Sequence, residues 1–374
     1  MNFDPNIHAE LVYDGGDRVH VPERLGKPTA SQLQGTPLEQ LAELCGRVCY
    51  DSLGSEKSRD SAAYHRHIQE VGHLSVYEHC NVTILTSYDG GSIASAIALS
   101  ALMNRPGVWL NVRGSQLRVT LNFRALLEFA EFSNGLPESL SNGANWLKMN
   151  LRAAACREMP AAFGDVIDTY TEYTTTYSLV EPECQEEQWI SLLMCGSRGM
   201  SHELVRHGDF TAISQRSTRY VNEDESPWVE HPLVTVYGDG TDDVALPCGT
   251  TPIGTHSLEW ETAEAFCKRI YSEAVDGLQP WLVGRGVDKF TARKQARGAA
   301  RGYLGNALYT ELIFSASVAQ WRRMLKQRCS DAADAEIRVL FSKALGELKR
   351  SRYRDSFQDM TLRSATDGIG EVLA

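Results

Sequence analysis

Hydrophobic and polar positions along the chain follow two different periods, which predict a mixture of helices and strands. Nearly continuous apolar runs predict buried strands at 82–87 and 189–195. Further strands are expected at 8–13, 108–121 and 309–314, and helices at 37–48, 56–71, 92–103, 122–132, 258–282, 287–300, 317–328 and 331–350, with more helix within 144–170. Polar stretches predict loops at 181–187, 209–222 and 239–256. Strands and helices do not alternate regularly, so we expect an α+β fold.

Two stretches repeat the same order of predicted elements, namely strand, apolar helix, strand and helix. The first runs from Val82 to Phe132 and the second from Trp189 to Arg328. The segment TLNFRALLEF can be aligned with SASVAQWRRM, although few residues are identical. The sequence is therefore compatible with two organisations, one large mixed domain or two divergent tandem copies. We divide the chain into an N-terminal part (1–135), a helical connector (136–187), a C-terminal part (188–350) and a tail (351–374).

Composition and charge narrow the class of protein. With 43% hydrophobic residues, the 374-residue chain can bury a sizeable core, and its net charge of −11 disfavours binding to nucleic acid. The longest apolar run, 93–103, is too short to span a bilayer, and the polar N-terminus shows no secretory signal. The nine scattered cysteines contain no pair of CxxC motifs, which favours reduced thiols. We expect a cytoplasmic protein without nucleic-acid or membrane partners.

The first candidate cluster lies in GHLSVYEH, between a predicted helix and a predicted strand. It offers a polar ligand two imidazoles, a hydroxyl and a carboxylate, from His73, Ser75, Glu78 and His79. The spacing alone would also suit a metal ion, but no further ligand set is nearby and we expect no metal. A hydrogen-bonded turn between helix and strand explains the same residues equally well.

The second cluster, VRHGDFTAISQRSTRY, concentrates arginines and hydroxyl groups in an acidic chain. Its polar members include Arg206, His207, Ser214, Gln215, Arg216, Ser217 and Arg219. Guanidinium groups bind phosphate oxygens in pairs and serine adds a neutral donor, so the cluster suits an anionic ligand. A solvated, salt-bridged loop is the alternative.

Two further arginines lie near the C-terminus. Arg301 precedes a predicted strand, and Arg328 ends the helix after it. An arginine at a helix C-terminus often only balances the helix dipole. No nucleophile stands out, because Cys248 in ALPCGT is interpreted as a loop cysteine, and neither a GxGxxG nor a GxxxxGK[ST] phosphate loop occurs.

Taken together, these clusters resemble the flavin-dependent thymidylate synthases. That family combines an HxS/TxxEH segment, an RHR signature followed by seven residues, serine and x-Arg-Tyr, and an ARxxLPxxxxTE segment before a helix that ends in arginine. The corresponding segments here are 73–79, 206–220 and ARGYLGNALYTE at 300–311, with Arg328 at the helix end. The order agrees, and the likeness covers 1–90 and 188–345. It implies the α+β fold of the thymidylate synthase complementing proteins.

The resemblance implies a cofactor, two cosubstrates and a substrate. FAD would be the working cofactor, methylenetetrahydrofolate the carbon donor and NADPH the reductant. The C5 atom of dUMP, or of a relative such as UMP, would be methylated. No enzyme cysteine attacks the base in this family, which fits the missing nucleophile. The implied assembly is a homo-oligomer, either a homotetramer or, for a duplicated chain, a homodimer that acts as a pseudo-tetramer.

The resemblance also implies residue roles. Catalytic roles fall to Arg328, Ser217 and His73. Substrate contacts fall to Glu203, Arg206, Gln215, Ser217, Arg219, Arg301 and Arg328. Cofactor contacts fall to His73, Ser75, Glu78, His79, His207, Asn122 and Arg124. Arg328 would stabilise the charge that develops on a pyrimidine carbonyl.

Several positions depart from the family pattern. The signature's second arginine, which would help to hold flavin, is replaced by Gly208-Asp209, and the family's proline by Gly305. The usual glutamine three residues before Arg206 is Glu203, whose charge would repel phosphate but could accept a bond from an amino group. The alternatives are therefore another pyrimidine nucleotide such as dCMP, a hydroxymethyl product, or a non-catalytic nucleotide- or flavin-binding homologue.

The last departure suggests a division of labour between two copies. The family's flavin-binding asparagine and arginine correspond to Ser317 and Ala319, whereas the middle stretch carries Asn122 and Arg124 before a leucine-rich helix. A duplicated chain would keep the flavin contacts in its middle part and the nucleotide contacts in its C-terminal part. The alternative is that Asn122 merely caps the helix that it begins.

Overall fold

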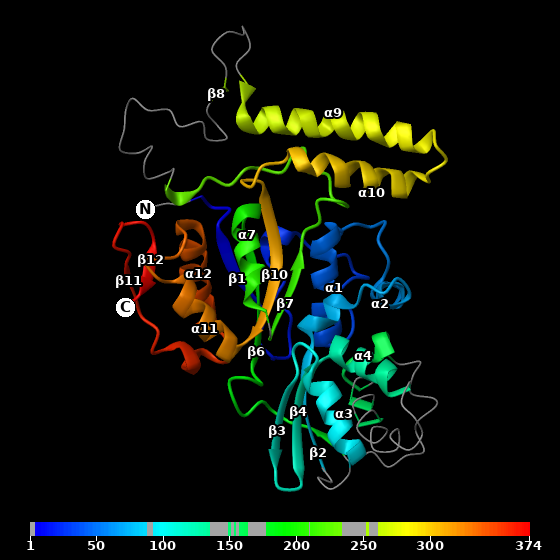
Figure 1. Ribbon diagram of the computed structural model, residues 1–374, viewed down its shortest axis with the longest axis vertical. Helices are drawn as coiled ribbons and strands as arrows, with labels where there is room; N and C mark the ends of the chain where they lie inside the picture. Colours follow the sequence, from blue (N-terminus) through cyan, green and yellow to red (C-terminus); the bar gives the residue numbers. More distant parts are fainter. Residues whose placement is uncertain are drawn as a thin grey trace.

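Two four-stranded antiparallel sheets organise the computed structural model (Figure 1). The structure describes residues 4–87, 93–134, 149–150, 153–154, 157–163, 177–208, 210–233, 252–253 and 261–374. Most of the expected connector (136–187) and of the loop at 239–256, including Cys248, lies outside these residues, as does Asp209. The mixture of helices with antiparallel sheets confirms the α+β class.

Sheet A has the strand order β1-β6-β10-β7. Its strands are β1 (His8–Tyr13), β6 (Trp189–Ser197), β7 (Thr211–Gln215) and β10 (Tyr309–Ser317), and all neighbours are antiparallel. Every residue of β6 is buried, which explains its continuous apolar run. In the ladder, Ile313 of β10 lies opposite Leu193 of β6 and Ser214 of β7.

Sheet B has the order β3-β4-β2-β5. Its strands are β2 (Asn81–Ser87), β3 (Trp109–Arg113), β4 (Gln116–Asn122) and β5 (Tyr177–Leu179), again antiparallel. Helix α3 (Ile93–Met103) connects β2 to β3, and α4 (Phe123–Asn134) follows β4. The β3–β4 hairpin turns at Gly114, whose φ of 60° favours glycine, and points away from sheet A in Figure 1.

The two sheets share a connectivity. In each, a central antiparallel pair (β6 with β10, or β2 with β4) carries on one side the strand that lies between the pair in sequence, β7 or β3. A helix follows the second central strand in each, and the capping residues Ser317 and Asn122 occupy equivalent places. The fourth strand differs, because β1 precedes its pair and β5 follows it. A gene duplication stays a prediction.

Helices cover sheet A from two sides. Helices α11 (Val318–Arg328) and α12 (Ala335–Leu348) pack against β10, β6 and β1, whereas α1 (Pro37–Tyr50) packs against β7 and β10, with the sheet between them in Figure 1. The indole N–H of Trp321 donates to the Ile190 carbonyl at 3.0 Å and so fixes α11 on β6. Glu336 of α12 accepts from the backbone and hydroxyl of Ser197, at 2.7 and 2.6 Å.

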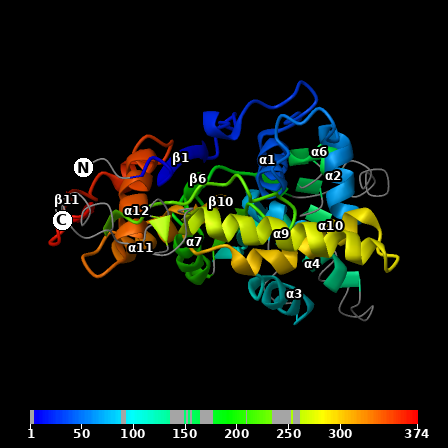
Figure 2. The ribbon, with the colours of Figure 1, turned by 90° about the horizontal axis from the view of Figure 1, so that it is seen from above.

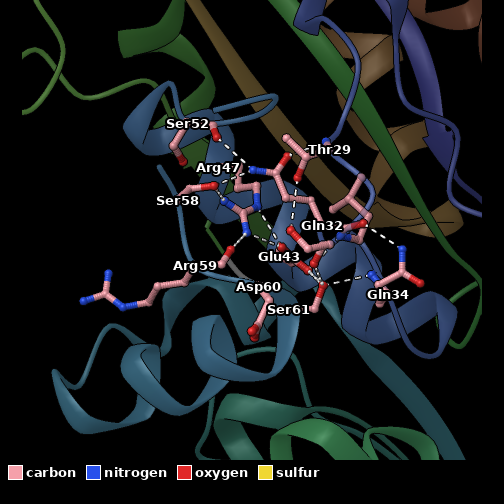
Figure 3. A network of polar contacts seen from close by, with 12 residues as sticks. Thr29, Gln32, Gln34, Glu43, Arg47, Ser52, Ser58, Arg59, Asp60 and Ser61 are labelled. Atoms are coloured by element: carbon pink, nitrogen blue, oxygen red, sulfur yellow. Dashed lines mark hydrogen bonds and ion pairs between the residues drawn. The ribbon is translucent and has the colours of Figure 1, made fainter. Parts of the chain in front are cut away.

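Helix α1 has a well-defined start and a buried ion pair. The Thr36 hydroxyl and the Glu39 carboxylate cap each other's backbone N–H groups. One turn further on, Glu43 Oε1 accepts from Arg47 Nε at 2.7 Å, and both side chains are almost fully buried (Figure 3). Ser61 Oγ lies 2.5 Å from the other Glu43 oxygen. This network binds two loops to the helix that positions the candidate site.

Two long antiparallel helices lie across one end of the molecule (Figures 1 and 2). They are α9 (Ala263–Val283) and α10 (Lys289–Ala300), and α10 leads directly to Arg301. The remaining described elements are η1 (Glu23–Leu25), α2 (Ser61–Glu70), η2 (Leu74–His79), α6 (Pro160–Phe163), α7 (Arg198–Leu204), η4 (Val205–His207), β8 (Pro252–Ile253), β9 (Glu261–Thr262), η5 (Arg301–Tyr303), η6 (Arg354–Phe357), β11 (Leu362–Ser364) and β12 (Glu371–Leu373).

Two sequence-based expectations are wrong. The predicted loop 209–222 contains strand β7, all of whose residues pair with β10, and Ala212 and Ser214 are buried there. Helix α2 begins at Ser61 rather than at 56, because the Asp60 side chain caps it there.

Two hydrophobic clusters fill the interior. One lies around sheet B, α1 and α4 and reaches Leu193 and Ile313, and the other lies between sheet A and helices α11 and α12. The proposed division into 1–135, 136–187, 188–350 and 351–374 stays a prediction. Among the described helices, none combines the length and apolarity needed to cross a membrane.

Candidate functional site

The turn that carries Ser217 directly follows β7 and is tied to helix α1. The Ser217 N–H donates to the Cys49 carbonyl oxygen at 3.0 Å, and the Val221 N–H donates to the Ser217 carbonyl at 3.0 Å. The Ser217 side chain is partly exposed, and its hydroxyl accepts weakly from the Arg219 N–H at 3.4 Å. Helix α1 therefore determines where this hydroxyl is presented.

His73 lies close to the same turn. The hydroxyl of Tyr50, the last residue of α1, lies 2.7 Å from His73 Nδ1, and the Tyr50 and Tyr220 rings meet edge to face at 4.8 Å. The Lys294 ammonium lies 4.8 Å from the centre of the Tyr220 ring. Partial burial, together with the charge of Lys294, lowers the pKa of His73, so its imidazole is neutral at pH 7. Two of the three predicted catalytic residues thus share one surface.

Two predicted substrate-binding arginines flank this turn. Arg219 is exposed on the turn itself, and Arg301 is exposed at the start of η5. Neither forms an ion pair with another described residue. Arg198, which was not among the candidate residues, lies nearby, because its guanidinium donates to the Arg216 carbonyl oxygen at 3.3 Å. Burial and the charge of Arg301 lower its pKa. The sequence feature that could have identified Arg198 is its position directly after the apolar run of a buried strand. We call Ser217, Arg219, Arg301 and His73 the Ser217 group.

Arg216, between β7 and this turn, is structural. Its guanidinium lies 3.5 Å from a carboxylate oxygen of Glu223, 3.6 Å from Asp51 and 3.8 Å from Glu311. Burial raises the pKa of Glu311, while the Arg216 charge opposes that shift. The arginine therefore ties the turn to β10 and to the end of α1, and is not available to a ligand.

Arg328, the last residue of α11, is held by α7 and η4. Its NH1 lies 2.5 Å from Glu203 Oε2, its NH2 donates to the Glu203 carbonyl at 3.1 Å, and its Nε donates to His207 Nε2 at 3.1 Å. Only 17% of the side chain is exposed. Burial and the arginine's charge lower the pKa of His207 to about 4, so the imidazole is a neutral acceptor. We call Arg328, Glu203 and His207 the Arg328 group.

Helix α7 separates the two groups. Arg198 is its first residue and Glu203 lies near its end, so their backbones are about 8 Å apart at the α-helical rise of about 1.5 Å per residue. Gln215 lies between them and donates to Ser201 Oγ at 2.8 Å and to Thr310 Oγ1 at 3.1 Å. Arg206 is exposed in η4, beside the Arg328 group. The predicted substrate-binding residues thus form two groups in one chain.

The predicted flavin residues meet where η2 lies against α4. Arg124 pairs with Glu78 through NH1, and its Nε donates to Glu128 Oε1 at 2.8 Å. Burial raises the pKa of Glu78 despite the arginine. The exposed side chains of His73 and Ser75 lie at the start of the same 3-10 helix.

Asn122 and His79 are engaged within the chain. Asn122 Oδ1 accepts from the Ala125 N–H at 2.8 Å, which caps α4, and its Nδ2 donates to the Pro106 carbonyl at 3.1 Å. Both nitrogens of the buried His79 lie within 3 Å of a hydroxyl, at 2.7 and 2.9 Å, on β10 and β7 respectively. Burial lowers the pKa of His79 to about 3. Cofactor contacts by either side chain stay predictions and would have to replace these bonds.

A known family matches the C-terminal half. The model of the family described as thymidylate synthase complementing protein matches residues 185–351. That range contains both the Arg328 group and, apart from His73, the Ser217 group. The flavin-dependent thymidylate synthase of Mycolicibacterium gilvum is 31% identical over 184 residues, which cover 49% of this chain and 66% of the relative. The Mycobacterium tuberculosis (strain H37Rv) enzyme is 35% identical over 164 residues, 44% of this chain and 58% of the relative. The chain spans less than two thirds of the length of these curated relatives.

Two solved structures are also similar. One is thymidylate synthase X from Helicobacter pylori with FAD and dUMP, with 18% identity, 46% of this chain and 73% of that chain covered, and a TM-score of 0.26. The other is the UMP/dUMP methylase PolB from Streptomyces cacaoi bound with 5-Br UMP, with 14% identity, 46% and 74% covered, and a TM-score of 0.30.

Proposed function

Because the chain belongs, through residues 185–351, to the flavin-dependent thymidylate synthase family, we propose that it methylates C5 of a uridine nucleotide, dUMP or a close relative. The observation that carries the proposal is that Ser217, Arg219 and Arg301 share one surface, while Arg328 is held in a fixed position at the C-terminal end of α7. A protein that binds no nucleotide would have no physical need for these four residues in this arrangement.

The nucleotide phosphate would bind to the Ser217 group. Arg219 and Arg301 are exposed and form no ion pair with a described residue, so each can offer a guanidinium fork to phosphate oxygens. The Ser217 hydroxyl adds a neutral donor. Arg206, exposed in η4, would approach the nucleotide from the side of Arg328.

Arg328 would act on the pyrimidine ring. A fixed guanidinium beside a ring carbonyl stabilises negative charge that develops there, an effect worth about 3–4 kcal/mol in comparable sites. His73, neutral at pH 7, is available to accept a proton. Gln215 offers its carbonyl oxygen, since its amide nitrogen is already donated to Ser201 and Thr310.

FAD is the proposed cofactor, and reduced FAD supplies the hydride when bound. The arginine, hydroxyl and imidazole of Arg124, Ser75 and His73 offer hydrogen-bond donors near η2, which suits the carbonyl and nitrogen acceptors of a flavin ring. Glu78 holds Arg124 there, and His207 lies near the other group. Methylenetetrahydrofolate as carbon donor and NADPH as reductant complete the proposal.

A second copy of the chain would complete the active site. The two groups lie at opposite ends of α7 within one chain. We propose that the nucleotide bridges the Ser217 group of one copy and the Arg328 group of another. A homodimer acting as a pseudo-tetramer and a homotetramer both satisfy this arrangement.

The carboxylate of Glu203 is also compatible with a second class of substrate. This carboxylate, beside Arg328, could accept from the exocyclic amino group of cytosine as well as from uracil N3–H. Methylation or hydroxymethylation of dCMP, and methylation of UMP, are therefore the alternatives, with a non-catalytic nucleotide- or flavin-binding protein as the third.

The visible absorbance spectrum of the purified protein, before and after addition of dUMP, tests the proposal. We expect flavin bands that shift with dUMP, followed by turnover with methylenetetrahydrofolate and NADPH. Bands that respond only to UMP or dCMP would identify another substrate. A colourless protein that takes up no added FAD would refute the flavoenzyme.

The proposed flavin contacts have a separate test. Arg124→Ala should weaken FAD binding, measured by fluorescence quenching on titration, by about tenfold, because a charge-assisted hydrogen bond contributes about 1.5–3 kcal/mol. Arg285→Ala, an exposed arginine stacked on Trp281, is the matched control. Equal FAD affinities in all three proteins would contradict flavin contacts in the middle part of the chain.

A further inference from the structure

The carboxylate at position 203 is engaged inside the chain. Arg328 reaches Glu203 twice, through the side chain at 2.5 Å and through the backbone carbonyl at 3.1 Å, and the third guanidinium nitrogen donates to neutral His207 at 3.1 Å. Each nitrogen of Arg328 thus has a partner within the chain.

In this arrangement the Arg328–Glu203 pair is neutral overall, although the guanidinium itself stays charged. Its positive charge is matched by one carboxylate, and His207 adds no charge at neutral pH because its pKa is about 4. A guanidinium paired in this way still has N–H groups that can share a second acceptor, such as a carbonyl oxygen. For a phosphate, however, the attraction to Arg328 is offset by repulsion from Glu203 at nearly the same distance.

The surroundings of Glu203 strengthen this effect. A cavity of about 240 Å³ opens beside it and is also lined by Asp334 and Glu336. His231, which also lines the cavity, is paired with Asp334 at 3.1 Å. An anion that enters this cavity beside Glu203 meets the carboxylates of Glu203, Asp334 and Glu336.

We propose that Glu203 is a positioning and specificity-determining residue: it fixes Arg328 and cancels its charge, so that the Arg328 group takes the uncharged carbonyl edge of a pyrimidine ring and rejects phosphate. The phosphate is thereby directed to the exposed arginines Arg206, Arg219 and Arg301. The inference rests on the proposed function and sets the orientation of the nucleotide between the two groups.

The test compares three variants by isothermal titration with inorganic phosphate, uridine and UMP. Glu203→Gln should bind inorganic phosphate about tenfold more tightly than the unmodified chain, because one negative charge close to Arg328 is lost. Glu203→Asp keeps that charge and should bind phosphate as weakly as the unmodified chain. Glu273→Gln, which removes a carboxylate from an exposed pair with Arg269, is the matched control.

Kinetics give a second readout. Glu203→Gln should lower kcat about 10-fold or more while KM for the nucleotide stays the same or falls, because Arg328 is freed to bind anions but no longer held for the ring. Unchanged phosphate affinity in a folded Glu203→Gln protein, or the same gain in Glu203→Asp, would overturn the proposal. An unmodified chain that binds neither flavin nor nucleotide would instead refute the proposed function, and the phosphate titration would still report on Glu203.

Discussion

His79 is a titratable side chain buried without a charge partner. Its ordinary pKa of 6.5 falls to about 3 in the folded chain, because burial disfavours the imidazolium. Between these pH values the unfolded chain binds a proton that the folded chain does not, so stability falls as the pH is lowered. We expect His79 to account for about 4 kcal/mol of lost stability between pH 7 and pH 3.

Urea unfolding at several pH values checks this expectation. The unfolding free energy of His79→Gln should vary less with pH below 6.5 than that of the unmodified chain, with part of the remaining dependence due to His207. Parallel curves for the two proteins would show that His79 is not the source of acid sensitivity.

Arg328 should be sensitive even to a conservative change. Lysine cannot reproduce a fork that reaches Glu203 and His207 together, so Arg328→Lys should lower kcat about 10²-fold with little change in KM. Steady-state kinetics measure this, with Arg285→Lys as control. A proportionate rise in KM alone would mean that Arg328 contributes only to binding.

At the scale of single residues, the sequence predicts which side chains are candidates for a site, but it does not predict which side chains contact one another. Arg328 and Glu203 were both candidates, yet they are 125 residues apart and nothing local indicates that they pair. Arg198 was missed for the same reason, since its burial and the nearby charges of Glu223 and Arg301 come from segments distant in the sequence. The motif residues of a known family were recognisable because their spacing along the chain is fixed.

Among the elements, apolar periodicity predicts best where one face is buried. Helices α1 and α11 and strands β6 and β10 were expected close to their observed bounds. Strand β7 was not, because TAISQ is polar and its structure depends on pairing with β10, which lies 100 residues away.

The buried Glu43–Arg47 pair should be the most sensitive point of α1. Glu43→Gln leaves Arg47 buried with one carboxylate charge missing, which should cost about 3–5 kcal/mol. Thermal unfolding followed by circular dichroism measures the loss, and Glu273→Gln, in an exposed pair with Arg269, is the control. A loss below about 1 kcal/mol would contradict a stabilising role for this network.

Two variants of Asn122 can distinguish helix capping from cofactor binding at the start of α4. Asn122→Asp keeps the capping oxygen, whereas Asn122→Ala removes it and should cost about 1 kcal/mol of stability. If Asn122→Ala weakens FAD binding while Asn122→Asp does not, the effect comes from the cap. Equal weakening in both variants would indicate a direct contact through the amide nitrogen.

For the whole molecule, the separation of the two groups predicts complementation between copies. An Arg328→Ala protein and a Ser217→Ala protein should each be nearly inactive. In a dimer with shared sites, mixing them should restore about a quarter of the activity, because half of the dimers are mixed and each has one intact site. Activity assays after co-refolding measure this, and no recovery in a mixed oligomer would mean that one chain holds a whole site.

The overall architecture was only partly predictable. The α+β class, strand β1 and the repeated order of strand, helix, strand and helix followed from the sequence, but the edge strands β5 and β7 did not, because their pairing depends on partners distant in the sequence. The shared connectivity of sheets A and B appears only when those pairings are known.

The placement of β1 has a consequence for how the chain is made. Sheet B draws all its strands from within 81–179, so a ribosome can release it as a closed unit early in synthesis. Strand β1 leaves the ribosome before the other strands of sheet A, but its partner β6 is synthesised about 180 residues later. Sheet A is complete only after β10 has also been synthesised. During this interval an apolar strand is unpaired, so a chaperone that shields the emerging N-terminus should raise the yield of native protein more than one added after release.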